Sequence, residues 1–300
     1  MSPGTSPSAG PAPSEDLDLR FVVAVGITVV AILSQYFVPQ TWAPAQSLYG
    51  NLPGDLLVVY GIPVVAFSFL VGAGPLRGWA GRMGSAAFHG LKWYGALSFA
   101  ALLVTLVLIA VYESVDPSAL QLLSRPNPAL TAASGDPWFW IGFSFVVGAF
   151  EETIFRGWIF GYWQGRATDW RLPAVGSSAI FAGVHLYYGT TYGAASPLIF
   201  PMLFAVGFAF ALTYRQSGGN LVVIAFLHGL FDASAFYSLI NPTGALVFRY
   251  VPMLVGLVLF AGYYLTHESE PVFPASPGDA SDQRSGERIS SIQSPSGPSK

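Results

Sequence analysis

The chain has 300 residues, of which 53% are hydrophobic and 10% are charged, and its formal net charge is -3. Soluble domains carry about 25% charged residues, so this composition indicates a membrane protein. The lack of cysteine excludes disulfides, thiolate zinc sites, a cysteine nucleophile and a lipid anchor on sulfur, and the small net charge gives no indication of nucleic-acid binding.

Both ends of the chain are polar. Residues 1–17 are rich in Pro, Ser and Gly, and residues 267–300 are rich in Ser, Pro, Gly and Asp, so we expect two disordered tails. The N-terminal tail has neither the basic region nor the short apolar region of a signal peptide, so the first apolar run is expected to remain as an uncleaved span. The expected transmembrane domain is residues 18–266.

Between the tails, eight apolar runs are long enough, or nearly so, to cross about 30 Å of hydrocarbon. The sequence therefore predicts an all-α polytopic membrane protein with about eight transmembrane helices and disordered N- and C-terminal tails. The fifth run is short and contains polar residues, so it needs protein around it. The expected spans are Phe21–Val38, Leu56–Ala73, Tyr94–Tyr112, Trp138–Phe160, Pro173–Tyr188, Leu198–Tyr214, Leu221–Ile240 and Leu246–Leu265.

The Lys and Arg residues predict the orientation. Of the 13, eleven fall on one side of the predicted membrane, including Arg77, Arg82 and Lys92 between the second and third spans. The other side has only Arg125 and Arg249. Because positively charged loops stay in the cytoplasm, we expect a multi-pass protein of the cell membrane with both termini cytoplasmic.

A charged motif follows the uncharged stretch 138–150. Glu151, Glu152 and Arg156 would each cost roughly 2.5–3.5 kcal/mol in a bilayer interior on insertion scales, so their presence needs a reason. On a helix, Glu152 and Arg156 are four residues apart with the acid first, which favours an ion pair. Glu151 points about 100° away and lacks that partner. The pattern predicts a structural pair and one carboxylate left available for chemistry.

Three further polar residues lie within the expected spans. His185 ends the fifth span, with Phe181 four residues earlier on the same face, and His228 and Asp232 share a face of the seventh. With a rise of about 1.5 Å per residue, Glu151, His185 and His228 lie roughly 10, 18 and 12 Å from the cytoplasmic surface. We therefore expect them to converge in the cytoplasmic half of the membrane.

A carboxylate and two imidazoles in an apolar surrounding can form a hydrolytic site, and two versions are open. Glu151, His185, His228 and Asp232 could ligate Zn2+, although a catalytic zinc keeps one position for water. Without metal, Glu151 and His185 would activate water, His228 would donate to an oxyanion, and Asp232 would orient His228. The metal-free version is slightly favoured, because only His228 and Asp232 are preset as a close pair on one helix.

Three motifs occur in order on three spans, and a single one of them would be weak support. Together they resemble the CAAX protease and bacteriocin-processing family of intramembrane endopeptidases, also called the Abi or type II CAAX prenyl endopeptidase family. The resemblance covers about residues 138–240. The motifs are Glu151-Glu152-x-x-x-Arg156, Phe181-x-x-x-His185 and His228-x-x-x-Asp232.

The resemblance implies an all-α membrane core whose cavity opens to the cytoplasm and the lipid. It implies cleavage near the C-terminus of a membrane-anchored protein or peptide, prenylated in part of the family. In this family's pattern Glu151 is the catalytic base, His185 helps it to hold water, and Glu152 with Arg156 is the supporting pair. His228 and Asp232 fall at the family's third site. Many members have Asn at the position of Asp232, and Asn can donate to an oxyanion whereas an ionised Asp cannot.

Two other classes of function compete with a protease. A non-catalytic membrane scaffold or a bacteriocin self-immunity protein would be favoured by loss of Glu151 or of either histidine, but all three are present. A proton-coupled transporter also uses buried Glu and His residues. Such transporters often show inverted repeats and paired broken helices, and the sequence contains no repeat between its halves. The sequence does not predict an oligomeric state.

The predicted orientation can be tested with single cysteines, because the natural chain has none. Thr5→Cys and Ser290→Cys should both be protected from a membrane-impermeant thiol reagent in intact cells and become reactive after permeabilisation. Labelling of either residue from outside intact cells would contradict the cytoplasmic placement of that terminus.

Overall fold

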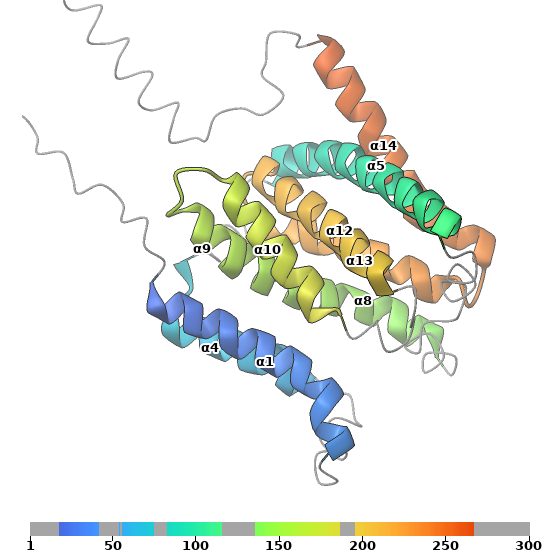
Figure 1. The fold of residues 1–300 in the computed structure, drawn as a ribbon. Helices are drawn as coiled ribbons and strands as arrows, with labels where there is room; N and C mark the ends of the chain where they lie inside the picture. The colour runs from blue at the N-terminus through green and yellow to red at the C-terminus, as the bar shows by residue number, and fades with distance from the viewer. Residues whose placement is uncertain are drawn as a thin grey trace, which may run out of the picture. The chain divides into compact units, whose positions relative to one another are not determined.

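The structure, a computed structural model, describes residues 18–41, 54, 56–74, 83–115, 136–186 and 196–266. These residues form eight helical segments and contain no strand, which confirms the predicted all-α class (Figure 1). Five helices in the described ranges are long and apolar enough to cross a membrane, and two further apolar helices are shorter. The chain is therefore a polytopic membrane protein. The two predicted tails, residues 1–17 and 267–300, lie outside the described residues.

Each helical segment falls on one of the predicted apolar runs, and two segments contain π-helix. Residues 1–259 form one compact unit and residues 260–300 a second, of which the structure describes the last turns of the final helix. The elements are α1 (Leu19–Thr41), η1 (Leu57–Gly61, π-helix), α4 (Ile62–Leu70), α5 (Met83–Val115), α8 (Pro137–Glu152), η4 (Thr153–Phe160, π-helix), α9 (Gly161–Gln164), α10 (Arg171–Val184), α12 (Ser196–Gln216), α13 (Leu221–Tyr237) and α14 (Pro242–Thr266).

The third helix begins earlier than the sequence predicted. α5 starts at Met83 rather than near Tyr94, so the expectation that Lys92 lies in a loop is wrong. The Lys92 side chain is buried, and its Nζ lies 5.9 Å from the ring centroid of Phe88, one turn earlier on α5. The long aliphatic stem of a lysine packs along apolar surface, and this packing allows a charged residue at a buried position inside the helix.

Three of the predicted spans are too short to cross a membrane alone: η1 with α4 (Leu57–Leu70), α10 and α13. α13 ends at Tyr237 rather than Ile240, and its 17 residues span roughly 25 Å. α10 has 14 residues, about 21 Å. Its buried Ser177 and Ser178 satisfy their hydroxyls by donating to the carbonyl oxygen of Ala174. From residue 176 onward this short, polar helix has no exposed position, as the composition of the fifth run predicted, whereas Leu172 and Val175 near its start are exposed.

Side-chain caps define where the two helices of the motif-bearing core begin. Asp136 accepts a hydrogen bond from the Phe139 N–H (3.2 Å) at the start of α8. Asn220 accepts one from the Val223 N–H (3.1 Å) at the start of α13. The turn before Asn220 contains Gly219 at φ 78°, a left-handed conformation that favours glycine.

Close packing of α8 on α13 is the most extensive helix pairing in the described part of the chain. A Cβ on Gly148 would lie 2.8 Å from the backbone nitrogen of Gly229, and one on Gly229 would lie 2.6 Å from a ring carbon of Phe145. Only glycine permits this approach. Since Glu152 is one turn beyond Gly148 and His228 directly precedes Gly229, the same contact brings both side chains together.

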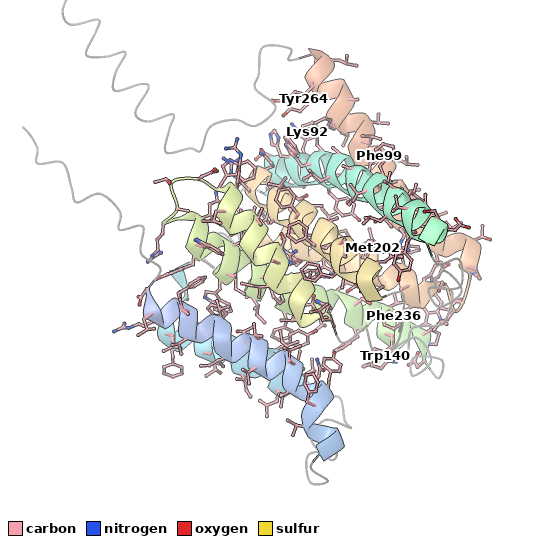
Figure 2. The ribbon with its side chains drawn as sticks, viewed as in Figure 1. Lys92, Phe99, Trp140, Met202, Phe236 and Tyr264 are labelled. Atoms are coloured by element: carbon pink, nitrogen blue, oxygen red, sulfur yellow. The ribbon has the colours of Figure 1, made fainter. Side chains whose placement is uncertain are left out.

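At the other end of the same two helices, aromatic side chains pack across the interface. Trp140 of α8 stacks on Phe236 of α13 with ring centroids 5.8 Å apart, and Figure 2 shows the two side chains near each other. The pair closes the end of the α8–α13 interface that lies away from Glu152. Such stacked pairs add about 0.5–1.5 kcal/mol beyond the burial of area.

The N-terminal helices form a pair that packs on the π-helix after α8. α1 and α4 run side by side (Figure 1). Phe67 of α4 stacks on Trp158 of η4 with centroids 5.3 Å apart, and the Trp158 Nε1 donates to the carbonyl oxygen of Gly72 (2.9 Å). Phe21 of α1 stacks on Tyr162 of α9 at 4.8 Å. These contacts hold α1 and α4 against η4 and α9, which directly follow the acidic motif.

Candidate active site

The two adjacent glutamates stand at a change of helix type. Glu151 and Glu152 are the last residues of α8, and the π-helix η4 follows for eight residues. π-helical turns are rare and are frequent at functional sites. Every residue of η4 from Ile154 to Phe160 is buried. Because a π-turn closes i→i+5 hydrogen bonds, the side-chain faces along η4 depart from a period of 3.6 residues, although Glu152 and Arg156 still meet across four residues at its start.

Glu152 is fully buried, with 0% of its side chain exposed, and it binds two nitrogen donors through one oxygen. Its Oε1 lies 3.0 Å from Nη1 of Arg156 and 2.6 Å from Nδ1 of His228. The structure therefore contains the predicted pair and adds a contact that the sequence did not predict. An ionised carboxylate only accepts hydrogen bonds, so Nδ1 of His228 carries the proton that it donates to Glu152.

Arg156 is enclosed by aromatic rings and backbone. Its Nη2 donates to the carbonyl oxygen of Gly207 on α12 (3.0 Å). The guanidinium carbon lies 4.6 Å from the ring centroid of Phe181 and 5.4 Å from that of Phe210. A desolvated cation over aromatic faces gains electrostatic stabilisation of about 2 kcal/mol. Phe181, which was predicted to be a supporting residue, thus contacts Arg156 directly.

Glu151 differs from its neighbour in charge environment and exposure. Its side chain is 12% exposed, and no Lys or Arg in the described ranges forms an ion pair with it. Its Oε1 accepts a hydrogen bond from the hydroxyl of Tyr60 (3.2 Å). The same oxygen lies 4.0 Å from Nε2 of His185, and Oε2 lies 3.8 Å from Nε2 of His228. Contacts of this length between polar atoms are compatible with a bridging water.

His185 directly follows the last residue of α10, and its ring is fixed by its own helix. Nδ1 lies 2.7 Å from the carbonyl oxygen of Phe181. A carbonyl can only accept, so Nδ1 carries the proton and Nε2 of the neutral ring holds a lone pair. The ring of Phe181 lies 4.6 Å away between centroids and limits its rotation. Nε2 is the ring nitrogen that faces Glu151, 4.0 Å from its Oε1.

His228 and Asp232 are paired on α13, as the sequence predicted from their spacing. Nε2 of His228 lies 3.4 Å from Oδ2 of Asp232, whose side chain is 31% exposed. The imidazole packs against Phe210 at 4.8 Å between ring centroids. Since Nδ1 is held by Glu152, only Nε2 of His228 remains to face Glu151 and Asp232.

The structure thus brings all four of the predicted site residues together, from α8, the end of α10 and α13. Sequence reasoning missed Tyr60, which reaches the cluster from η1. The only signal was a phenol within the apolar run Leu56–Ala73, and a phenol is common in membrane helices. It also did not predict that Glu152 would bind His228, because Glu152 was expected to pair with Arg156 alone.

The contacts of the two imidazoles bear on the zinc-dependent version of the site. In the ranges that the structure describes, no group of three or more His, Asp and Glu side chains is already placed to hold a metal ion. Nδ1 of His228 is engaged by Glu152 and Nδ1 of His185 by a carbonyl, so each ring could bind a metal only through Nε2. Zinc binding by Glu151, His185, His228 and Asp232 stays a prediction.

Ionisable residues buried in an apolar helical core mark a functional site in a membrane protein. A family model described as Type II CAAX prenyl endopeptidase Rce1-like matches residues 133–234. This confirms the resemblance that the three motifs indicated, and all of the predicted site residues lie in the matched segment. No curated protein and no solved structure matched the chain.

The buried pair predicts a large effect on stability. Glu152→Ala and Arg156→Ala should each lower the free energy of unfolding by roughly 3–5 kcal/mol, because each leaves a buried charge without its partner. The double variant should recover part of the loss. Thermal unfolding in detergent measures the effect.

Arg171→Ala is the matched control for the pair. Arg171 pairs with Asp169 at 3.3 Å, but the side chains are 73% and 51% exposed, so the change should stay within about 1 kcal/mol. If Glu152→Ala and Arg156→Ala both melt like Arg171→Ala, the structural role of the buried pair is wrong.

Proposed function

We propose that the protein is an intramembrane endopeptidase that hydrolyses a peptide bond near the C-terminus of a membrane-anchored protein or peptide, with prenylated substrates included. The observation that carries the proposal is the pair of acceptors formed by Glu151 and His185. Their facing atoms are 4.0 Å apart at the edge of an apolar core. The family match supports hydrolysis of a peptide bond as the reaction.

The two acceptors orient a water molecule. Oε1 of Glu151 and Nε2 of His185 both offer lone pairs, so a water between them donates one O–H to each. Both of its hydrogens are then engaged, and its own lone pairs point away, toward an incoming carbonyl carbon. Holding a nucleophile in this orientation lowers the entropic part of the barrier.

The reaction then needs only the side chains of the cluster. As the water oxygen bonds to the scissile carbonyl carbon, Glu151 takes one water proton and the carbonyl oxygen becomes an oxyanion. His228, protonated at Nε2, donates a hydrogen bond to that oxyanion while Asp232 and Glu152 balance the charge of the ring. Glu151 returns its proton to the amide nitrogen, the C–N bond breaks, and a carboxylic acid and an amine form; the acid then gives its proton to the amine, and a carboxylate and an ammonium leave.

The cellular arrangement belongs to the same proposal. Both termini lie in the cytoplasm, the protein resides in the plasma membrane, and the site faces the cytoplasmic half of the bilayer. The excess of Lys and Arg on that side supports the orientation. A substrate held by its own membrane anchor would then meet Glu151 without leaving the lipid.

Glu151→Gln tests the assignment of the base. Glutamine keeps the volume but cannot take the proton, so cleavage by the purified protein should fall by about 10²–10⁴-fold, the usual contribution of a general base. Glu113→Gln on the exposed surface of α5 is the matched control and should cleave like the wild type.

Membrane peptides that accumulate in a Glu151→Gln strain and not in the wild type would identify the substrate. Near-normal proteolysis by the purified Glu151→Gln protein would contradict the assignment of Glu151 as the general base. If neither strain accumulates a peptide and the wild type cleaves none, the non-catalytic scaffold is the better description.

Asp232→Asn separates the metal-free reaction from a zinc-dependent one. In the metal-free reaction Asp232 only orients and balances His228, so the variant should retain activity within about tenfold of the wild type, the effect of one hydrogen bond. Activity at saturating substrate, with and without added zinc, measures this. Loss of activity that zinc restores, together with chelator inhibition of the wild type reversed by zinc alone, would contradict the metal-free reaction.

A further inference from the structure

Tyr60 contacts the proposed base from outside the segment that matches the protease family. Its hydroxyl donates to Oε1 of Glu151 at 3.2 Å. Tyr60 lies on η1, whereas the family match begins at residue 133. Among the described residues, the other polar side-chain atoms near the Glu151 carboxylate, Nε2 of His185 and Nε2 of His228, lie farther from it, at 4.0 and 3.8 Å.

We propose that Tyr60 is a positioning residue of the active site, which holds the Glu151 carboxylate so that its Oε1 faces His185. This inference rests on the proposed function, because the geometry that Tyr60 maintains is the one that orients the water. It adds the N-terminal helices to a site whose recognised motifs all lie in the later part of the chain.

Glu151 needs such a donor because its other neighbours do not supply one. Nε2 of His185 is 4.0 Å from Oε1 of Glu151, too long for a direct hydrogen bond. Nε2 of His228 is 3.8 Å away, too long for a direct hydrogen bond. A glutamate without an anchor samples several rotamers, and most of them move Oε1 away from His185.

The phenol is itself held in place from two sides. Its ring stacks on Phe150, the residue before Glu151, with centroids 5.3 Å apart and planes 18° apart. The helix that follows η1 is fixed to η4 through Phe67 and Trp158, whose rings stack at 5.3 Å. A hydroxyl held by this packing limits the orientation of the carboxylate to which it donates.

Tyr60 takes no proton in the reaction. Oε1 of Glu151 can accept one hydrogen bond from Tyr60 and one from the water, because a carboxylate oxygen has two lone pairs. When Glu151 takes the water proton and later returns it, the phenol O–H bond stays intact. Removal of the Tyr60 hydroxyl should therefore slow the chemical step, because Glu151 loses its orientation, and leave binding of the substrate unchanged.

Tyr60→Phe tests this role because it removes the hydroxyl and keeps the ring that stacks on Phe150. We expect kcat to fall about 10- to 100-fold, the range for one hydrogen bond to a charged group, with KM and the thermal midpoint unchanged. Tyr162→Phe is the matched control: Tyr162 is also buried and stacks on Phe21 in the same hydrophobic cluster, and it should keep wild-type kcat.

A wild-type kcat for Tyr60→Phe would overturn the inference, and so would a rise in KM alone or a loss of kcat matched by Tyr162→Phe. Infrared spectroscopy separates this result from failure of the proposed function. Glu151→Gln identifies the carboxylate band of Glu151, and Tyr60→Phe should shift that band while Tyr162→Phe leaves it in place. If the wild type cleaves nothing, the proposed function fails. The infrared result still tests the contact in that case: an unshifted Glu151 band in Tyr60→Phe contradicts the hydrogen bond from Tyr60, and a shifted band supports it.

Discussion

The burial of the Glu152 carboxylate is the constraint on which the rest of the core depends. A charge with 0% exposure must be matched inside the protein, because it has no water to solvate it. Arg156 and His228 both donate to the same oxygen of Glu152, and Arg156 also donates to the carbonyl of Gly207. One carboxylate thereby ties together α8, η4, α12 and α13, and loss of any partner leaves an unmatched charge in that core.

This network needs helices that approach more closely than ordinary side chains allow. The Gly148–Gly229 contact brings α8 against α13, and only then does His228 come within 2.6 Å of Glu152. The glycines lower the helix propensity of both segments, by roughly 1 kcal/mol each relative to alanine. In a membrane, where helix association lacks a hydrophobic driving force, close backbone packing and interhelical hydrogen bonds offset that loss.

How much of this could be read from the sequence depends on the range of the interaction. The Glu152–Arg156 and His228–Asp232 pairs are four residues apart on one helix, so their spacing predicted them. Contacts between distant segments, such as Tyr60 with Glu151, depend on how each helix is rotated, and composition does not determine that. The π-helix η4 and the helical position of Lys92 were missed for a related reason: periodicity assumes a regular helix and a charge-free span, and tertiary packing overrode both.

Two neighbouring residues of the same type thus acquire different chemistry from their surroundings alone. Glu152 places one oxygen between two nitrogen donors, and its other oxygen, which is buried, has no hydrogen-bond partner among the residues that the structure describes. Glu151 binds a single neutral hydroxyl, keeps lone pairs free and is 12% exposed. Water can therefore reach only one of the two carboxylates, and that one faces Nε2 of His185. If the two glutamates were to exchange roles, the side chains around both would have to change, because an arginine that immobilises a carboxylate, as Arg156 does for Glu152, would compete with water at Glu151.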